Sequence, residues 1–384
     1  MNLPIIHDLP LPSLTSLLAE WSEPAYRARQ IWQGLYRHYY NSPAEFTNLP
    51  LSLRAKLAEN LQFAALTPIS QLASRDHQTV KTLFRLHDGQ TIEAVLLRYG
   101  DPAGLDTPAA PVLDQQEPRR SSAPKARIGT KPRRTLCIST QVGCAMGCVF
   151  CATGQMGFRR HLSSGEIVAQ VMYYARLLSE TSEFSKNSEV SRVTNVVVMG
   201  MGEPFHNYDN TIAAIDRLND PQGYNFGARR FTISTVGLVP AIRRFTAEKR
   251  QVNLAISLHA ADDALRSSML PVNKKYPIDE ILAACREYIS ATGRRVSFEW
   301  ALIRNINDTP VQARLLAEKL KGLLCHVNVI PLNPTRGYPG QATTRQRAEK
   351  FKEILEQAGV ACTIRLRRGV EIQAGCGQLV VSEN

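Results

Sequence analysis

The chain has 384 residues, 44% of them hydrophobic, with a formal net charge of +12 and a pI of about 9.4. It has no run of about 20 apolar residues and no basic N-terminal stretch followed by an apolar core, which excludes a membrane-spanning protein and argues against a signal peptide. We therefore expect a cytoplasmic protein. The positive charge favours a polyanionic partner, meaning nucleic acid or an anionic membrane, although a merely basic enzyme explains the charge equally well.

The first segment, residues 1–70, shows helical periodicity. Apolar residues recur at helical spacing in 11–21, 23–38 and 51–61. These patterns predict a small helical domain with several basic positions. For any single arginine, a solvated helix face is at least as good an explanation as a contact with nucleic acid.

The next two segments differ in composition. Residues 71–100 carry β-favouring residues on both sides of Asp88 and Gly89, which predicts a β-hairpin with Glu93 on its second strand. Residues 101–134 hold six prolines and many basic residues, which predicts a flexible basic linker or insertion. Its basic half could touch phosphates, but a solvated loop is the simpler interpretation.

Residues 135–384 alternate between strand and helix patterns. The predicted strands are nearly all apolar, as strands of a parallel sheet covered on both faces are. They are 135–139, 193–200, 230–235, 252–259, 295–303 and 326–333. Six such units are too few for a closed eight-stranded barrel. We therefore expect an α/β fold with an open, partial (β/α)6 barrel, and a flat doubly wound sheet is the alternative.

Distinctive polar and glycine-rich residues follow successive predicted strands. Because the carboxyl ends of parallel strands meet at one edge of a sheet, these residues are expected to face one cavity. They are the cysteine loop 143–154, the turn 200–204, Ser234 with Thr235, the run Ser257, Leu258 and His259, and Asn333. In the turn, glycines allow close backbone approach, and Glu203 could accept a hydrogen bond from a ligand's ammonium group. Alone, the turn is also consistent with a tight connection, and His259 with a satisfied interior histidine.

Three cysteines in the first of these loops form the pattern C-x3-C-x2-C. They are Cys144, Cys148 and Cys151. Thiolates bind zinc and iron–sulfur clusters, and structural sites of both kinds normally have four protein ligands. Three cysteines on a four-iron cluster leave one iron open to a small-molecule ligand. The alternative is a zinc site with a distant fourth ligand such as His161, but the compact pattern favours the cluster.

The other cysteines are interpreted from their surroundings. The irregular spacing of all eight does not resemble a disulfide framework and indicates a reducing compartment. Cys376 lies between glycines near the C-terminus, a setting typical of reactive cysteines. Cys137 lies on the strand that leads into the cysteine loop, where a small buried hydrophobic residue is the simplest interpretation.

Together these motifs resemble a known family. A C-x3-C-x2-C pattern followed by a GEP turn is similar to the signature of the radical S-adenosylmethionine superfamily. Within it, the chain resembles the RNA adenine methyltransferases of the RlmN/Cfr type over most of its length. The segments that carry the resemblance are CISTQVGCAMGCVFCATGQMGF, VVVMGMGEPFHNYDN, TISTVGLVP, LAISLHA, PLNP and GCGQL. The stretch 101–134 departs from the family, which usually has a short connection there.

The resemblance implies roles for particular residues. One [4Fe-4S] cluster per chain would be held by Cys144, Cys148 and Cys151. S-adenosylmethionine, two molecules per turnover, would be bound by Gly202, Glu203, Ser234, Ser257, Leu258, His259 and Asn333. Cys376 would carry the methyl group, and Cys137 would resolve the covalent RNA adduct through a transient disulfide with Cys376. Glu93 would be the proton acceptor.

The resemblance also implies an activity and its partners. A methyl group would pass from S-adenosylmethionine to Cys376, be activated by a 5′-deoxyadenosyl radical, and add to carbon 2 of an adenine in 23S ribosomal RNA and tRNA. Residues 1–70 would be an RNA-binding accessory domain. A monomer with an electron donor such as flavodoxin or ferredoxin, and no membrane, is expected. Methylation of carbon 8, as in the Cfr type, is one alternative, and a zinc-stabilised, non-catalytic RNA-binding protein is another.

Overall fold

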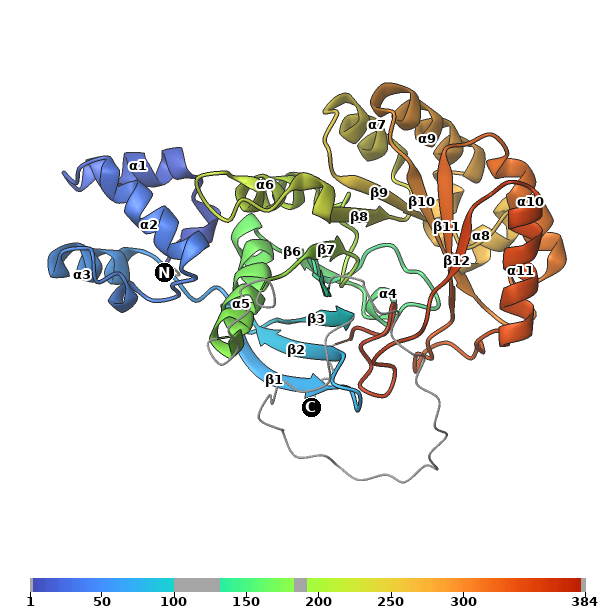
Figure 1. The fold of residues 1–384 in the computed structure, drawn as a ribbon, viewed down its shortest axis with the longest axis horizontal. Helices are drawn as coiled ribbons and strands as arrows, with labels where there is room; N and C mark the ends of the chain where they lie inside the picture. Colours follow the sequence, from blue (N-terminus) through green and yellow to red (C-terminus); the bar gives the residue numbers. More distant parts are fainter. Residues whose placement is uncertain (1–2, 100–131, 183–191, 381–384) are drawn as a thin grey trace.

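The computed structural model describes residues 3–99, 132–182 and 192–380. In these ranges ten strands form one mixed sheet in the order β1-β2-β3-β4-β7-β8-β9-β10-β11-β12, and β5 pairs with β6 outside it. Helices pack against the sheet, so the α/β class predicted from the sequence is confirmed (Figure 1). Most of the predicted linker 101–134 lies outside the described residues.

Three helices near the N-terminus confirm the periodicity of the first segment. They are α1 (Leu11–Glu20), α2 (Tyr26–Arg37) and α3 (Leu51–Asn60). Helix α2 buries Ile31 and Leu35, which lie one helical turn apart. At its end, Arg37 donates hydrogen bonds to the carbonyl oxygens of Pro221 and Gly223. The helices are thereby tied to a distant loop of the chain.

The predicted hairpin is confirmed and belongs to the large sheet. Strands β2 (Thr79–Arg85) and β3 (Thr91–Tyr99) pair antiparallel, and β3 pairs with β4 (Arg133–Cys137). In that register Val95 lies opposite Cys137. Strand β1 (Thr67–Ala73) was not predicted, because it is a mostly exposed edge strand without an alternating burial pattern.

The six strands predicted for the core are confirmed. They are β4 and its parallel neighbours β7 (Asn195–Val198), β8 (Phe231–Thr235), β9 (Asn253–Ser257), β10 (Val296–Leu302) and β11 (Cys325–Pro331). A further strand, β12 (Cys362–Ile364), pairs with β11 and was not predicted, because three residues are too few for a periodic signal. Among the described strands, the edges β1 and β12 do not pair, so the sheet stays open.

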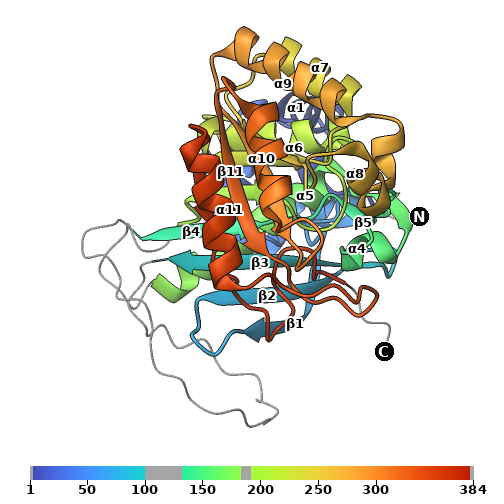
Figure 2. The same cartoon turned by 90° about the vertical axis from the view of Figure 1, so that its right-hand side faces the viewer.

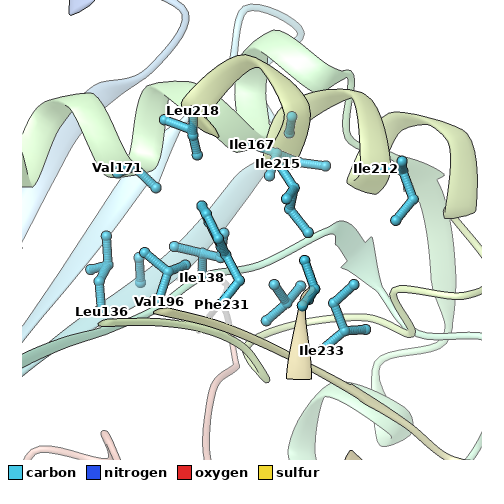
Figure 3. Close-up of a cluster of buried hydrophobic side chains, with 14 of the residues drawn as sticks. Leu136, Ile138, Ile167, Val171, Val196, Ile212, Ile215, Leu218, Phe231 and Ile233 are labelled. Carbon is cyan, nitrogen blue, oxygen red and sulfur yellow. The ribbon is translucent and has the colours of Figure 1, made fainter. Parts of the chain in front are cut away.

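Helices cover the outer face of the parallel strands. In chain order they are α5 (Ser164–Ser182), α6 (Tyr208–Asn219), α7 (Val239–Ala247), α9 (Ile278–Thr292), α10 (Pro310–Leu320) and α11 (Arg345–Gln357). Figure 2 looks onto α10 and α11, which pack against each other in front of β11. Figure 3 shows the apolar layer under α5 and α6, where Leu136, Val196 and Ile233 face Val171 and Ile215. Burial of such side chains is the main favourable contribution to folding.

Short elements complete the carboxyl side of the sheet. They are β5 (Gln141–Gly143), α4 (Ala152–Gln155), β6 (Phe158–His161) and α8 (Asp263–Met269). Short 3-10 helices occur at Ile6–Asp8, Pro43–Glu45, Ala228–Arg230 and Pro271–Lys274. No described helix is both long and apolar enough to cross a membrane.

Alternation along the strands separates apolar from polar side chains. On β10, Phe298 and Trp300 are fully buried in the outer core, whereas Ser297 and Glu299 face the opposite, concave side. Residues from β3 through β11 line one cavity on that side. The sheet therefore curves around this cavity, as a partial barrel does.

Candidate active site

A cavity of about 170 Å³, here called the inner cavity, lies at the carboxyl ends of the parallel strands. Ten residues singled out in the sequence line it: Cys144, Cys148, Cys151, Gly202, Glu203, Ser234, Ser257, His259, Asn333 and Cys376. They come from widely separated segments, so only the folded chain brings them together.

The three motif cysteines lie in the loop between β5 and α4. Burial raises the pKa of Cys144 to about 12 and raises the pKa of Cys148 well above its usual value. A bound metal would reverse this, because thiols lose their protons when they coordinate a cation. Within the described ranges, no three His, Cys, Asp or Glu side chains lie close enough to share one metal ion. The trio suits a cluster better than a single zinc ion, since a cluster holds each cysteine on a different iron.

Gln141 of β5 connects the cysteine loop to the GEP turn. Its Oε1 accepts the backbone N–H of Glu203 at 2.8 Å. Its Nε2 lies 3.1 Å from Nδ1 of His161 and 3.0 Å from Nδ1 of His206. His161, the alternative fourth ligand of a zinc site, therefore has its Nδ1 engaged by Gln141.

The GEP turn fixes a buried carboxylate at the cavity wall. Gly202 has φ +99°, and a Cβ there would lie 2.5 Å from the Cβ of Gln141, so this position requires glycine. Glu203 accepts the backbone N–H groups of Val236 at 2.9 Å and Phe205 at 3.0 Å. Burial still raises the pKa of Glu203 to about 7. An ammonium group beside it would favour the ionised carboxylate.

The ends of β8 and β9 add hydroxyls and an imidazole. The Oγ atoms of Ser234 and Ser257 lie 3.1 Å apart. His259 has φ +61°, its ring packs edge-on against Phe150 of the cysteine loop, and its Nδ1 accepts the N–H of Ala301 at 2.9 Å. Burial lowers the pKa of His259 to about 3, so the ring is neutral. With Nδ1 accepting, the proton is on Nε2, which makes His259 a hydrogen-bond donor.

The loop that carries Cys376 is held against the cysteine loop. The Ala152 N–H donates to the carbonyl oxygen of Gly377 at 2.8 Å, and Thr153 Oγ1 donates to that of Leu379 at 2.6 Å. Ala152 directly follows the last motif cysteine. These contacts fix Cys376 beside the loop predicted to hold the cluster.

Cys376 is also fixed by Asn333. The Asn333 Nδ2 donates to the carbonyl oxygen of Cys376 at 3.0 Å, while Asn333 Oδ1 is buried without a hydrogen-bond partner. The Cys376 side chain is exposed, yet the surrounding protein and the Glu299 carboxylate raise the pKa of its thiol. A buried acceptor without a partner indicates that a ligand supplies the donor.

A second space of about 860 Å³, here called the wide cavity, adjoins the inner one. Both cavities are lined by Cys376, Asn333 and Glu299. Among the described residues, the arginines that line the wide cavity are Arg133, Arg229, Arg294, Arg295, Arg365, Arg367 and Arg368. None of these seven forms an ion pair with a described acidic residue. Such a lining attracts an anionic ligand.

Cys137 of β4 lines the wide cavity together with Cys376. Burial raises the pKa of the Cys137 thiol, and the nearby Cys376 raises it further. Both are free thiols in the structure. From its position on a strand, Cys137 was interpreted as a buried hydrophobic residue, whereas the resemblance implied a reactive cysteine. In the structure it lines the same cavity as Cys376.

Glu93 of β3 lines neither cavity. Its carboxylate pairs with Lys81 Nζ at 2.7 Å and accepts the N–H of Val380 at 3.0 Å. Burial raises the pKa of Glu93, although Lys81 acts in the opposite direction. Through Val380, Glu93 anchors the loop that carries Cys376.

Leu258 also lines neither cavity, because its side chain is fully buried. Sequence reasoning overlooked Arg266 of α8, a buried residue that donates to the carbonyl oxygens of Leu258, Ser257 and Val236. No local pattern signals this role, because the oxygens belong to other segments. Other site residues that were overlooked are Gln141, Glu299 and Asn328.

Two family models match the chain. Residues 138–315 match the Radical SAM superfamily, and residues 5–63 match the ribosomal RNA large subunit methyltransferase N-terminal domain. The crystal structure of a radical SAM methyltransferase from Sphaerobacter thermophilus is similar with a TM-score of 0.86 and 45% identity, covering 98% of this chain and 99% of that chain. Fold and site therefore define a radical SAM enzyme.

Named relatives cover nearly the whole chain. A probable dual-specificity RNA methyltransferase RlmN from Chloroflexus aurantiacus is 46% identical over 97% of this chain and 92% of its own length. The dual-specificity RNA methyltransferase RlmN 1 from Myxococcus xanthus is 43% identical over 97% of this chain and 93% of its own. The chain therefore belongs to the RlmN family of radical SAM RNA methyltransferases. Membership implies a [4Fe-4S] cluster, S-adenosylmethionine and an RNA substrate.

Proposed function

We propose that the protein methylates carbon 2 of an adenine in 23S ribosomal RNA and in tRNA, with Cys376 as the methyl carrier. The observation that carries the proposal is the position of Cys376 where two cavities meet. Motif cysteines line one cavity, and arginines without acidic partners line the other. A methyl carrier must reach both the methyl donor and the RNA base, and a side chain exposed at this junction does so.

The groups that line the inner cavity fit the cofactors of the superfamily. One cluster per chain would be held by Cys144, Cys148 and Cys151. Two molecules of S-adenosylmethionine per turnover would contact Gly202, Glu203, Ser234, Ser257, His259 and Asn333, with Leu258 contributing through its backbone at most. The Asn333 Oδ1 without a partner and the Nε2 proton of His259 support this assignment. When bound, the reduced cluster supplies the electron that cleaves the sulfonium bond homolytically.

The two reactive cysteines act in sequence. Cys376, as a thiolate, accepts a methyl group by displacement. Once a hydrogen atom has left that methyl group for the cleaved cofactor, its carbon bonds to the adenine ring, which would then give up its ring proton to a base and one electron to the cluster. Cys137 then attacks the Cys376 sulfur, which releases the methylated RNA and leaves a Cys137–Cys376 disulfide for external thiols to reduce. Their shared position in the wide cavity and their electrostatic interaction support this order.

Glu93 is the proposed acceptor of the proton that leaves the adenine ring. Its raised pKa suits a base, but its carboxylate is engaged by Lys81 and by the N–H of Val380. Because Glu93 lines neither cavity, proton acceptance requires the C-terminal loop that Glu93 anchors through Val380 to move so that the adenine can reach it. A Glu93→Gln variant should accumulate the covalent adduct between Cys376 and RNA, visible on a denaturing gel.

The arginines of the wide cavity support RNA as the partner, since guanidinium groups bind phosphates through paired hydrogen bonds. We divide the chain into an RNA-binding accessory domain at 1–70, a hairpin extension at 71–100, a linker at 101–134 and a catalytic core at 135–384. Flavodoxin or ferredoxin would supply electrons to a monomer in the cytoplasm, where the thiols stay reduced.

The direct test is anaerobic incubation with RNA and labelled S-adenosylmethionine, followed by mass spectrometry of the RNA digest. We expect 2-methyladenosine, together with about four irons and four sulfides per chain. Detection of 8-methyladenosine would instead assign the Cfr-type activity. One zinc per chain without methylation would assign the non-catalytic RNA-binding alternative.

A further inference from the structure

Glu299 is a buried carboxylate on the cavity face of β10. Its side chain is 8% exposed, and its Oε1 accepts a hydrogen bond from Asn328 Nδ2 at 2.8 Å. No hydrogen bond to its Oε2 is found among the described residues, and this oxygen is open to the cavities that Glu299 lines. Arg365 attracts the carboxylate without forming an ion pair with it. A carboxylate in a largely buried position is stabilised by hydrogen-bond donors, so a ligand that enters the cavity can supply the donor that Oε2 lacks within the protein.

The position of Glu299 is set by the register of three neighbouring strands. Glu299 lies opposite Ser257 on β9 and opposite Asn328 on β11. Its carbonyl oxygen accepts the N–H of Leu258 at 3.1 Å, which fixes the backbone at this level of the barrel. Glu299 lines both cavities and interacts electrostatically with Cys376. A group that enters from the wide cavity and approaches Cys376 therefore meets Glu299.

The pair formed by Glu299 and Asn328 presents two acceptors. Because Asn328 donates its amide N–H to the carboxylate, its Oδ1 is left as an acceptor, and both residues line the wide cavity. An exocyclic amine carries two N–H groups and matches two such acceptors. Adenine has its amine at carbon 6, whereas guanine has a carbonyl oxygen there, which a carboxylate repels. Uracil has no amine, so the two acceptors select adenine and cytosine, which carry an exocyclic amine at this position, against guanine and uracil.

We infer that Glu299 and Asn328 bind the 6-amino group of the target adenine and thereby direct its carbon 2 toward the methyl carrier on Cys376. The inference rests on the proposed function and adds to it the residues that recognise the base. In adenine, carbon 2 is separated from the carbon that bears the amine by a single ring nitrogen, whereas carbon 8 lies in the other ring. Holding the amine next to Cys376 therefore favours carbon 2.

A chemical double-mutant cycle tests the inference. One RNA carries adenine at the target position and the other carries purine, which lacks only the 6-amino group. For the unmodified protein, kcat/KM should fall by about 10²-fold on the purine RNA, as expected for a lost hydrogen bond to a charged group. Glu299→Gln should lower kcat/KM on the adenine RNA by about the same factor, because an amide N–H then faces the amine. That variant should distinguish the two RNAs by less than about threefold.

The matched control is Glu287→Gln, the same change at a half-exposed position of α9, which should behave like the unmodified protein on both RNAs. Binding of the two RNAs without S-adenosylmethionine gives a second readout, and only adenine RNA should bind Glu299→Gln more weakly. If the unmodified protein methylates the adenine RNA and the purine RNA with equal kcat/KM, the inference is overturned and the proposed function still stands. This measurement needs no variant protein. A Glu299→Gln protein that keeps the full preference for adenine would also overturn it. Absence of methylation on adenine RNA would reject the proposed function itself.

Discussion

The two faces of the parallel sheet differ in how their polar groups are satisfied. On the outer face, strand residues such as Leu136 and Phe231 are fully buried under helices (Figure 3). On the cavity face, Glu299 Oε2 and Asn328 Oδ1 are acceptors without a hydrogen-bond partner in the described part of the chain. The Oδ1 of Asn333 is buried and also lacks a partner there. Buried polar groups without partners cost free energy in the free protein, so they are expected where a ligand supplies the missing partner.

The arginines of the two regions show the same contrast. On the outer helices, Arg243 pairs with Glu287 at 3.0 Å and Arg347 pairs with Asp308 at 2.6 Å. The arginines around the wide cavity have no acidic partner among the described residues, and two of them, Arg133 and Arg368, stack on Tyr99. The outer arginines are neutralised by acidic residues of the protein, whereas the arginines of the wide cavity remain available to an anionic substrate.

The largest effect is expected when the proposed methyl carrier of the cavity region is removed. Cys376→Ala should lower methyl transfer to RNA by at least about 10³-fold, because its thiol contributes chemistry rather than packing. The iron–sulfur absorbance and the melting temperature should stay unchanged. The control is Cys285→Ala, on the outer face in α9, which should lower the melting temperature and retain activity. Full activity of Cys376→Ala would reject the carrier role.

The outer region should show a pH-dependent stability through His7. Its ring is buried against Tyr36, and Arg217 and Asp8 are the charged groups near it. Burial, with a smaller contribution from Arg217, lowers the pKa of His7 to about 4 in the folded protein. Between about pH 6.5 and pH 4 the unfolded chain binds a proton that the folded chain does not. The free energy of unfolding should therefore fall by up to about 3 kcal/mol as the pH drops through this range.

Urea unfolding at pH 7.5 and pH 5 measures this effect in the unmodified protein and in His7→Gln. Glutamine cannot take up the proton, so the loss of stability at pH 5 should be smaller in the variant. His259 also has a lowered pKa and acts in the same direction, so the difference between the two proteins isolates His7. Identical pH dependence in both proteins would show that His7 is protonated equally in the folded and unfolded chains.

The smallest effect is expected on RNA affinity when two arginines are neutralised, either at the wide cavity or on the outer helices. Arg229→Gln with Arg295→Gln, at the wide cavity, should weaken RNA binding about tenfold and reduce the slope of log affinity against log salt by about two. Arg243→Gln with Arg345→Gln removes the same charge from ion-paired outer positions. That pair should change affinity little and leave the melting temperature nearly unchanged, because exposed ion pairs contribute little to stability. Equal losses of affinity would mean that net charge, and not position, governs binding.

Much of the fold and part of the site follow from local patterns. The apolar runs of the six core strands and the spacing in α1, α2 and α3 were sufficient to predict those elements. Because the carboxyl ends of parallel strands meet at one edge of the sheet, the sequence predicted that Glu203, Ser234 and Asn333 face one cavity. All three line the inner cavity in the structure. The exposed edge strand β1 and the short strands β5, β6 and β12 were missed because they carry little burial periodicity.

The missed site residues lie inside correctly predicted elements. Glu299 and Asn328 were predicted to be strand residues. Nothing in the sequence shows that they lie directly opposite each other on neighbouring strands. That pairing depends on the register between β10 and β11, which is set by packing along both strands. Arg266 was missed for a related reason, since the carbonyl oxygens it binds end two other strands.

Cysteine spacing, glycine turns and apolar runs are properties of neighbouring residues, so the sequence alone was enough to predict the six core strands, the candidate cluster loop that follows the first of them and, through the resemblance, the class of chemistry. Which side chains remain without a partner is a property of contacts between distant segments. Folding placed Glu93 against Lys81 and Val380 instead of in a cavity, and left Glu299 open toward Cys376. Two carboxylates on strands of one sheet, Glu93 on β3 and Glu299 on β10, thus have different surroundings, because the balance between burial and hydrogen bonding is settled only when the segments pack together.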